Sequence, residues 1–307
     1  MYDEAITYFN QLSKNLGNEC VRHGFSSRPR VYSVATCAEG LGSTTFSLNF
    51  ATALGKLGQR VVLVDASTTK EGFSKYVPLQ KKKSIADVLS GCYTVSEIVQ
   101  PGPRNVSILP GTWGLEKISD YEKTSAGKLL QTFHEMPCST HTIIIDLGDV
   151  QGGLFPTLWT EADASLLLTT CDDDAVLGTY HIIKKHCDKS HGRKLHTIFN
   201  KTDHATQAKD AYVRLARSTQ RFLGISPQFD GDIPFDPFVE AACKAGDLVV
   251  ERAPRSDASK SIVSIAKKMM AKPIAVETPQ VQASGSPLPD TSPSFKFSNE
   301  MVERRAA

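Results

Sequence analysis

The chain has 307 residues, of which 40% are hydrophobic, and its formal net charge is +2 at pH 7. This balance supplies enough apolar material for one large α/β core and argues against a strongly basic nucleic-acid-binding protein. No apolar run approaches the roughly 20 residues of a membrane-spanning helix, and the acidic start MYDEAITYF differs from a secretion signal. The seven cysteines stand singly, which suits reduced thiols, so a cytoplasmic protein is expected.

The first segment of interest covers residues 3–17, where apolar residues recur at helical spacing after Asp3. These apolar residues are Ile6, Phe9, Leu12 and Leu16. A stretch rich in Gly, Ser, Arg and Pro follows at residues 24–30. We therefore predict a separate amphipathic helix and linker over residues 1–30.

Short β-branched runs alternate with helical patterns through the middle of the chain. The predicted strands cover residues 31–35, 61–64, 106–109, 142–145, 164–169 and 197–200. The predicted helices cover residues 44–57, 84–89, 94–100, 126–135, 176–185 and 208–223. Runs such as Ile143–Ile145 are apolar without alternation, which is typical of strands buried on both faces. We predict an α/β fold with a doubly wound, mostly parallel sheet over residues 31–271, and ligands at the carboxyl ends of its strands.

The composition changes at Lys272 to Pro, Ser, Gln and Thr, which predicts a disordered tail over residues 272–307. Just before this tail, residues 260–272 carry an apolar face flanked by lysines. Its apolar members are Ile262, Ile265, Ala266, Met269 and Met270. Such a face suits a membrane surface, but the closing helix of a folded core has the same pattern, so both interpretations stay open.

Residues 34–50, VATCAEGLGSTTFSLNF, have the frame of a phosphate-binding P-loop. A β-rich lead runs into a loop with Gly40 and Gly42, and a helix begins at Thr44–Thr45, where N–H groups and the helix dipole would receive phosphate oxygens. The pattern G-x-x-x-x-G-K-[ST] has a lysine where this chain has Ser43. The sequence predicts a phosphate site that has kept its shape and lost its cation.

The stretch from Val31 to Ser67 resembles the opening of MinD/ParA-type deviant Walker ATPases, where K-G-G-x-G-K-T-T leads a helix and the next strand ends in D-x-D. The similarity extends to about residue 270 through SIADVLSGCYTVSEIVQ, NVSILPGTWGLEKISD, IIIDLGD, FNKTD and DIPFDPFVEAACKAGDLVVERAPRSDASKSIVSIAKKM. The segments PGTWGLEKISD and IPFDP are most similar to the FlhG (YlxH) branch, which regulates flagellar number and placement. The resemblance implies a P-loop NTPase fold of the MinD-like (SIMIBI) class.

The resemblance also implies a site at numbered positions. A nucleotide would be held by Gly40, Gly42, Ser43, Thr44, Thr45 and, at the adenine, Asn200. Mg²⁺ would be held by Thr44, Asp65 and Asp146. Four positions depart from the family pattern: Ala38 replaces the signature lysine, Glu39 a glycine, Ser43 the P-loop lysine and Ser67 the second acid of D-x-D.

These departures oppose ATP chemistry. A unit charge pair at about 4 Å and an effective dielectric constant near 20 is worth about 4 kcal/mol, so the loss of a lysine at position 43 and the gain of Glu39 both disfavour a polyphosphate. Hydrolysis depends on cations and positioning that Ala38, Ser43 and Ser67 do not supply. We therefore expect a regulator of flagellar placement or number that is a pseudo-ATPase scaffold, with ATP and Mg²⁺ bound weakly and neither of them required.

Two other function classes stay open. The first is an active ATP-binding enzyme of the same fold, either an ATPase or a kinase. The segments SIADVLSG and NVSILPG also resemble bacterial tyrosine autokinases of polysaccharide export, although the last tyrosine here is Tyr212 and those kinases need the P-loop lysine. Gly40 and Gly42 followed by Asp65 mimic a dinucleotide fingerprint, although Thr45 stands at the third glycine. The run N-K-T-D that starts at Asn200 resembles the guanine-reading motif of GTPases, but the family resemblance makes it an adenine-side loop.

Partners are expected mainly from the N-terminal segment. FlhG proteins carry a leading D-Q-A-x-x-L-R element that docks on the signal-recognition-type GTPase FlhF, and the resemblance assigns partner binding to Asp3, Ala5, Ile6, Phe9 and Leu12. The alternative is a helix that packs on its own core. Flagellar components, a second copy of the chain and the inner face of the cell membrane are further expected partners, whereas nucleic acid is not.

Overall fold

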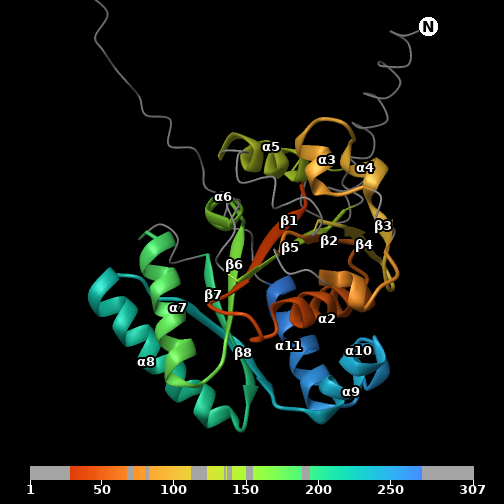
Figure 1. The fold of residues 1–307 in the computed structure, drawn as a ribbon. Coiled ribbons are helices and arrows are strands. Elements are labelled where there is room, and N and C mark those ends of the chain that lie inside the picture. The colour runs from red at the N-terminus through yellow and green to blue at the C-terminus, as the bar shows by residue number, and fades with distance from the viewer. Residues whose placement is uncertain are drawn as a thin grey trace, which may run out of the picture. The chain divides into compact units, whose positions relative to one another are not determined.

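A mostly parallel sheet forms the centre of the computed structural model, which describes residues 28–67, 72–79, 83–111, 123–134, 136, 140–149, 155–188 and 194–271. Within these residues the strand order is β3-β4-β2-β5-β1-β6-β7-β8 (Figure 1). The strands are β1 Arg30–Thr36, β2 Val61–Asp65, β3 Gln100–Pro101, β4 Val106–Leu109, β5 Thr142–Asp149, β6 Ala164–Thr169, β7 Leu195–Thr202 and β8 Gln228–Pro234. Strand β3 runs antiparallel to β4, and the other described neighbours are parallel.

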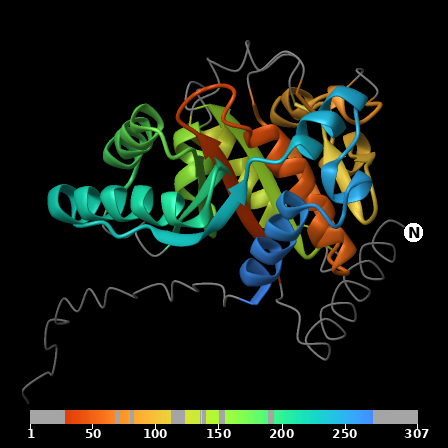
Figure 2. The same cartoon turned by 90° about the horizontal axis from the view of Figure 1, so that it is seen from below.

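Helices cover both faces of this sheet (Figures 1 and 2). One face carries α3 Ile85–Leu89, α4 Val95–Ile98, α5 Lys123–His134, α6 Phe155–Thr160, α7 Asp173–His186 and α8 Ala205–Leu223. The other carries α2 Ser43–Lys56, the 3₁₀ turn η1 Gly72–Lys75, α9 Pro237–Ala245, α10 Val249–Arg252 and α11 Asp257–Ala271. The predicted doubly wound α/β fold is therefore confirmed.

Strand β5 shows why the central strands read as continuous apolar runs. All of its residues are buried. Ile143 and Ile145 face the core cluster under α5 and α7, and Ile144 faces the cluster under α2 and α11. Because successive side chains point to opposite faces, a strand covered on both faces can carry a run of consecutive apolar residues, as Ile143 to Ile145 do here.

All six predicted strands are present, and the six predicted helices correspond to α2, α3, α4, α5, α7 and α8. The sequence pattern does not predict β8, because its sequence QFDGDIP contains two aspartates and a glycine, and its residues are only partly buried at the edge of the sheet. The short elements β3, α6, α9 and α10 are also absent from the prediction.

The sheet order bears on the dinucleotide alternative. Strand β5 pairs with both β1 and β2, so the two strands that flank the glycine loop and its helix are not neighbours. In the dinucleotide-binding order 3-2-1-4-5-6 these first two strands lie side by side. The topology therefore does not favour a dinucleotide-binding domain.

Helix α11 resolves the two interpretations of the closing amphipathic segment. Ile262, Ile265, Ala266 and Met269 are each at most 4% exposed and belong to the core cluster shared with α2. Lys268 lies at the rim, where its ammonium donates to the carbonyls of Phe229 and Asp230. The apolar face is thus part of the core. Among the described residues, no helix combines the length and the apolar character that crossing a membrane requires.

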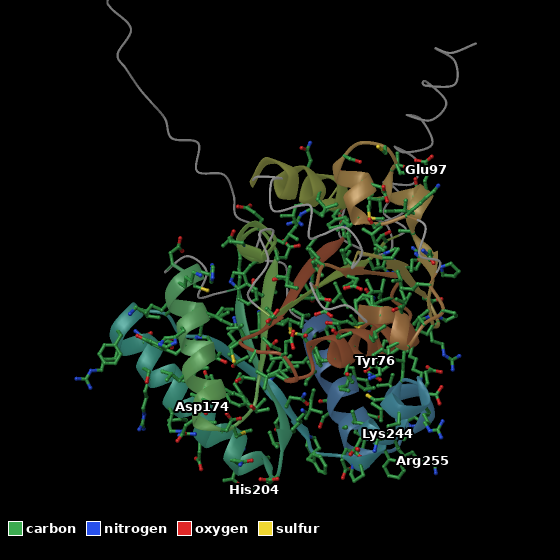
Figure 3. All side chains as sticks on the ribbon, viewed as in Figure 1. Tyr76, Glu97, Asp174, His204, Lys244 and Arg255 are labelled. Atoms are coloured by element: carbon green, nitrogen blue, oxygen red, sulfur yellow. The ribbon has the colours of Figure 1, made fainter. Side chains whose placement is uncertain are left out.

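Charged side chains lie at the periphery of the flanking helices (Figure 3). Asp174 and His204 are exposed on the side of α7 and α8, and Lys244 and Arg255 on the side of α9 and α11. The predicted N-terminal helix, with Asp3, Ala5, Ile6, Phe9 and Leu12, and the predicted tail at residues 272–307 lie outside the described residues.

Candidate functional site

The loop between β1 and α2 has the backbone geometry of an anion site. Gly40 and Gly42 adopt left-handed φ angles of 78° and 99°, and Gly42 is the N-cap residue of α2 without any side-chain cap. The amide of Phe46 donates to the carbonyl of Gly42 at 2.8 Å, which begins the helical ladder. The N–H groups before it have no intrahelical partner, so the N-terminus of this 14-residue helix can receive an anion.

The end of β7 holds this loop in place. The side-chain amide of Asn200 donates to the carbonyl of Leu41 at 2.8 Å, and the ammonium of Lys201 donates to the carbonyl of Gly40 at 2.8 Å. A Cβ atom on Gly42 would lie 2.8 Å from Nδ2 of Asn200, so this position requires glycine both for its φ angle and for space. Two residues from a distant strand therefore fix the shape of the loop.

Two buried carboxylates lie side by side on neighbouring strands, toward the carboxyl edge of the sheet. Asp65 closes β2 and Asp146 lies in β5, and the two are register partners. Asp65 accepts hydrogen bonds from the Ser67 hydroxyl at 2.9 Å, the Ser67 amide at 3.3 Å and the Phe73 amide at 3.3 Å. Asp146 accepts one from the amide of Gly148 at 3.2 Å, and its Oδ2 atom has no hydrogen-bond partner among the described residues.

Burial shifts the ionisation of both carboxylates. Desolvation raises the pKa of Asp65 to about 6. Desolvation and the neighbouring charge of Asp65 raise the pKa of Asp146 to about 7, although the nearby hydroxyls of Thr44 and Ser43 act in the opposite direction. A fully buried carboxylate oxygen without a partner, next to a second carboxylate and a hydroxyl, is an oxygen-rich environment that fits a divalent cation such as Mg²⁺.

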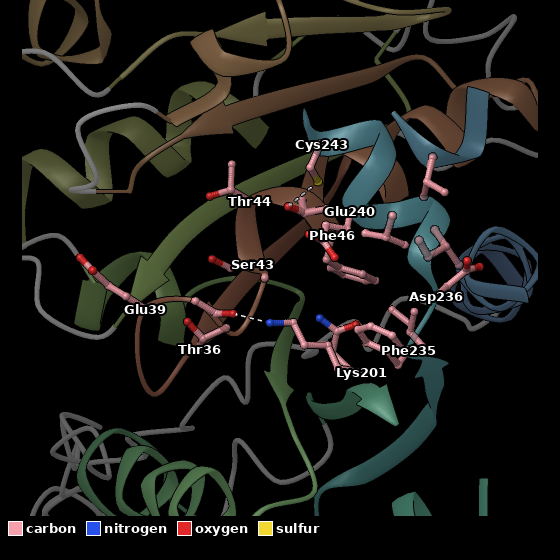
Figure 4. Close-up of a pocket in the computed structure, with 18 of the residues that line it drawn as sticks. Thr36, Glu39, Ser43, Thr44, Phe46, Lys201, Phe235, Asp236, Glu240 and Cys243 are labelled. Carbon is pink, nitrogen blue, oxygen red and sulfur yellow. Dashed lines mark hydrogen bonds between the residues drawn. The ribbon is translucent and has the colours of Figure 1, made fainter. Parts of the chain in front are cut away.

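A cavity of about 570 Å³ opens between the loop and the segment from β8 to α9 (Figure 4). At one end lie Thr36, Glu39, Ser43 and Thr44. The other end has an apolar wall formed by Ile233, Pro234, Phe235, Val239 and Ile262. A polar end built on a helix N-terminus and an apolar end built on a ring and aliphatic side chains suit a ligand with a charged part and a flat part.

The charges along this cavity are mainly negative. Glu39, Asp149, Asp236 and Glu240 line it, and Lys201 is the one Lys or Arg among its described lining residues. Burial opposes ionisation of Asp236, but the amides of Ala258 and Phe238 donate to its carboxylate and bring its pKa below the ordinary value. A polyphosphate in this cavity therefore meets more acids than bases.

The structure gathers the six predicted nucleotide-binding positions around this one cavity: Gly40, Gly42, Ser43, Thr44, Thr45 and Asn200. Asp146 lies beside Thr44, as the predicted metal site requires, and Asp65 lies beside Asp146. Ala38 and Glu39 are exposed in the loop, and Ser67 is buried against Asp65.

Two features of the site are not identified from the sequence. Lys201 follows Asn200 in the run N-K-T-D, and this adjacency is the signal that could have found it. Phe235 lies in the segment IPFDP and has no pattern of its own. Within the run N-K-T-D, Asn200 and Lys201 donate hydrogen bonds to the loop. The carboxylate of Asp203 instead accepts a hydrogen bond from the Gln207 side chain at 3.4 Å.

Comparison with known proteins agrees with this geometry. Residues 29–195 match a protein family described as an AAA domain. The chain is 27% identical over 236 residues to the antiactivator FleN of Pseudomonas aeruginosa, which covers 76% of this chain and 84% of FleN. It is 23% identical over 237 residues to the flagellum site-determining protein YlxH of Helicobacter pylori, which covers 76% of this chain and 79% of YlxH.

The fold also has counterparts among solved structures. The septum site-determining protein MinD of Pyrococcus horikoshii, complexed with Mg-ADP, superposes with a TM-score of 0.62 at 19% identity, over 78% of this chain and 96% of that chain. The doubly wound sheet therefore has the fold of the MinD/ParA P-loop NTPases. Since the matched AAA-domain family spans more than half of the sequence, the chain belongs to that family, as a MinD/ParA-type, FlhG-like ATPase homologue.

Proposed function

We propose that this protein regulates flagellar placement or number through protein partners, and that it binds an adenine nucleotide weakly without turning it over. The observation that carries the proposal is the loop from Ala38 to Thr45. Its glycines and helix N-terminus have the geometry of a phosphate site, whereas Ala38 and Ser43 stand where the family has lysines. FleN is described as an antiactivator and YlxH as a flagellum site-determining protein, which supports the flagellar part of the proposal.

The phosphate end of the cavity supports binding rather than turnover. Backbone N–H groups at the start of α2 would hold phosphate oxygens. Phosphoryl transfer also needs cations that stabilise the transferred group and a residue that positions water. Ala38, Ser43 and Ser67 provide neither, and the hydroxyl of Ser67 is already bonded to Asp65.

The base end of the cavity supports a nucleoside. Phe235 offers an aromatic face, and Ile233 and Val239 offer aliphatic contacts. The amide nitrogen of Asn200 is bonded to Leu41, which leaves its carbonyl oxygen available to accept from an exocyclic amino group such as that of adenine.

Thr44, Asp65 and Asp146 are the residues that would hold Mg²⁺. Bound there, the ion would neutralise phosphate charge and polarise phosphoryl oxygens. Thr44 would present its hydroxyl, and Asp146 would present its Oδ2 atom, which has no hydrogen-bond partner in the described part of the chain. The MinD of Pyrococcus horikoshii was solved with Mg-ADP, which supports this pair of ligands.

The partner side of the function rests on the N-terminal segment. We propose that Asp3, Ala5, Ile6, Phe9 and Leu12 form a helix that docks on a signal-recognition-type GTPase or on a flagellar component. A homodimer and contact with the inner face of the membrane remain part of the proposal. We infer a cytoplasmic location from the cysteines, since the five in the described part of the chain are free thiols.

The test combines a binding measurement with a turnover measurement on the full chain. Calorimetric titration should detect Mg-ATP and Mg-ADP, and phosphate release from Mg-ATP should not exceed that of a Thr44→Ala, Asp146→Ala double variant. If the wild type releases phosphate clearly faster than this double variant, the protein is an active ATPase and the proposal is wrong. Absence of any nucleotide binding would remove the nucleotide part of the proposal and leave the scaffold part.

A further inference from the structure

Lys201 lies at an irregularity of β7 that turns its side chain toward the phosphate loop. In the pairing of β7 with β8, Asn200 is opposite Ile233 and Thr202 is opposite Pro234, so Lys201 is the extra residue of a bulge. Its φ angle is 54°, and in the described part of the chain Arg104 is the one other non-glycine residue with a positive φ angle. Bulges commonly re-aim a side chain next to a functional site, and a left-handed non-glycine residue carries a conformational cost.

The re-aimed side chain reaches the loop itself (Figure 4). Its ammonium donates to the carbonyl of Gly40 at 2.8 Å, across 161 positions of sequence. Asn200 holds the next carbonyl, that of Leu41. A lysine ammonium has three N–H donors, and this hydrogen bond is the one that Lys201 makes with the described residues. Two donors therefore remain for a ligand.

The position of this positive charge matters because the loop between β1 and α2 contains no lysine or arginine. Ser43 replaces the P-loop lysine, and Lys201 is the one Lys or Arg among the described residues that line the cavity. Its aliphatic stem allows the ammonium to move, and a phosphate oxygen is a stronger acceptor than a neutral carbonyl. An anion at the start of α2 would therefore compete with Gly40 for this ammonium.

We propose that Lys201 supplies the positive charge for a nucleotide's phosphates in place of the residue at position 43. This assignment rests on the nucleotide binding proposed above. Lys201 is then a binding residue that lies on β7 and not on the loop after β1. The assignment predicts that nucleotide affinity depends on the number of phosphates and on the charge at position 201.

The test is a calorimetric titration of the full chain with Mg-ATP, Mg-ADP and adenosine. The variants are Lys201→Ala, Lys201→Gln and Lys201→Arg, with Lys209→Ala as a matched control because Lys209 is an exposed lysine on α8 that does not line the cavity. We expect Lys201→Ala and Lys201→Gln to weaken both phosphate-bearing nucleotides by about tenfold. Adenosine binding should be unchanged, and Lys201→Arg and Lys209→Ala should bind like the wild type.

Each other outcome has a definite meaning. Unchanged affinity of Lys201→Ala for Mg-ATP would overturn the assignment alone. Wild-type affinity of Lys201→Gln, together with weak binding by Lys201→Ala, would also overturn it, because the side chain would then act through its hydrogen bond to Gly40 and not through charge. If the wild type binds neither Mg-ATP nor Mg-ADP, the proposed nucleotide function fails and the assignment fails with it. Thermal melts of all variants identify any that do not fold.

Discussion

Two buried carboxylates near the cavity, Asp146 and Asp236, differ in their hydrogen bonding and in the direction of their pKa shifts. Asp236 caps α9 and accepts from the amides of Phe238 and Ala258 at 3.0 and 3.1 Å, and its pKa is below the ordinary value once these bonds overcome burial. Asp146 has an oxygen without a partner, stands beside Asp65, and has a pKa of about 7. Both oxygens of Asp236 accept hydrogen bonds from the protein, whereas Oδ2 of Asp146 has no hydrogen-bond partner among the described residues.

This difference separates a structural acid from a ligand-binding one. A buried carboxylate with a donor for each oxygen stabilises the fold by itself, whereas a buried carboxylate with one oxygen unpartnered costs free energy until a proton or a cation arrives. The carboxylate of Asp236, which lines the cavity, is therefore complete without a ligand, whereas the carboxylate of Asp146 beside Thr44 is not. Experiments that change one carboxylate at a time can test this contrast.

The largest expected effect is a gain of stability in Asp146→Asn. The folded-state pKa of Asp146 is raised from 3.8 to about 7, so the folded protein keeps a proton that the unfolded chain releases. Stability of the wild type therefore falls as the pH rises from about 4 to about 7 and stays low above that. Urea denaturation at pH 8 should show the variant to be more stable by about 3 kcal/mol.

The control for Asp146→Asn is the pH itself. At pH 4.5, only slightly above the unfolded-state pKa of 3.8, the loss of stability has just begun, so the difference between variant and wild type should shrink to about 1 kcal/mol. If Asp146→Asn were destabilised to the same extent at both pH values, the raised pKa of Asp146 would not be a cost to the stability of the wild type.

The next effect has the opposite sign. Asp236→Ala removes the acceptor for two backbone amides, one of them at the start of α9, and should destabilise the protein by about 2 kcal/mol in urea denaturation. Asp236→Asn keeps one acceptor oxygen and should lose less. A stability of Asp236→Ala equal to that of the wild type would show that this carboxylate is not the structural one.

A third effect, similar in size to that of Asp236→Ala, concerns the loop between β1 and α2. Gly42→Ala should cost about 2 kcal/mol, because its Cβ would meet Asn200 and its φ angle is 99°. Gly40→Ala is the matched control, since its φ angle is 78° but no atom lies within 4 Å of its Cβ position, and it should cost about 1 kcal/mol. Equal losses in the two thermal melts would mean that Asn200 does not hold the loop.

The sequence predicts those parts of this structure that depend on local patterns. Apolar runs such as Ile143–Ile145 identify buried strands, and the glycines of the phosphate loop identify the helix start that follows them. Both signals lie within a few residues of the feature that they predict. The acids Asp65 and Asp146 also stand directly after the apolar runs of their strands, so a local pattern is enough to single them out.

The rest depends on pairing between distant segments. The contact of Lys201 with Gly40 exists because β7 has a bulge against β8, and β8 is a polar edge strand that a pattern of apolar residues does not identify. The apolar wall at Ile233 and Phe235 depends on the same strand. Local sequence patterns therefore identify the phosphate loop but not Lys201, the residue on a distant strand that contacts it.

The burial of α11 means that its apolar face is occupied by the core of the protein and is not presented to a lipid surface. Releasing the helix would expose Ile262, Ile265 and Met269, each at most 4% exposed now, at a cost of at least about 5 kcal/mol. That is comparable to the whole stability of many domains. Exposing this face to water would therefore disrupt the folded core.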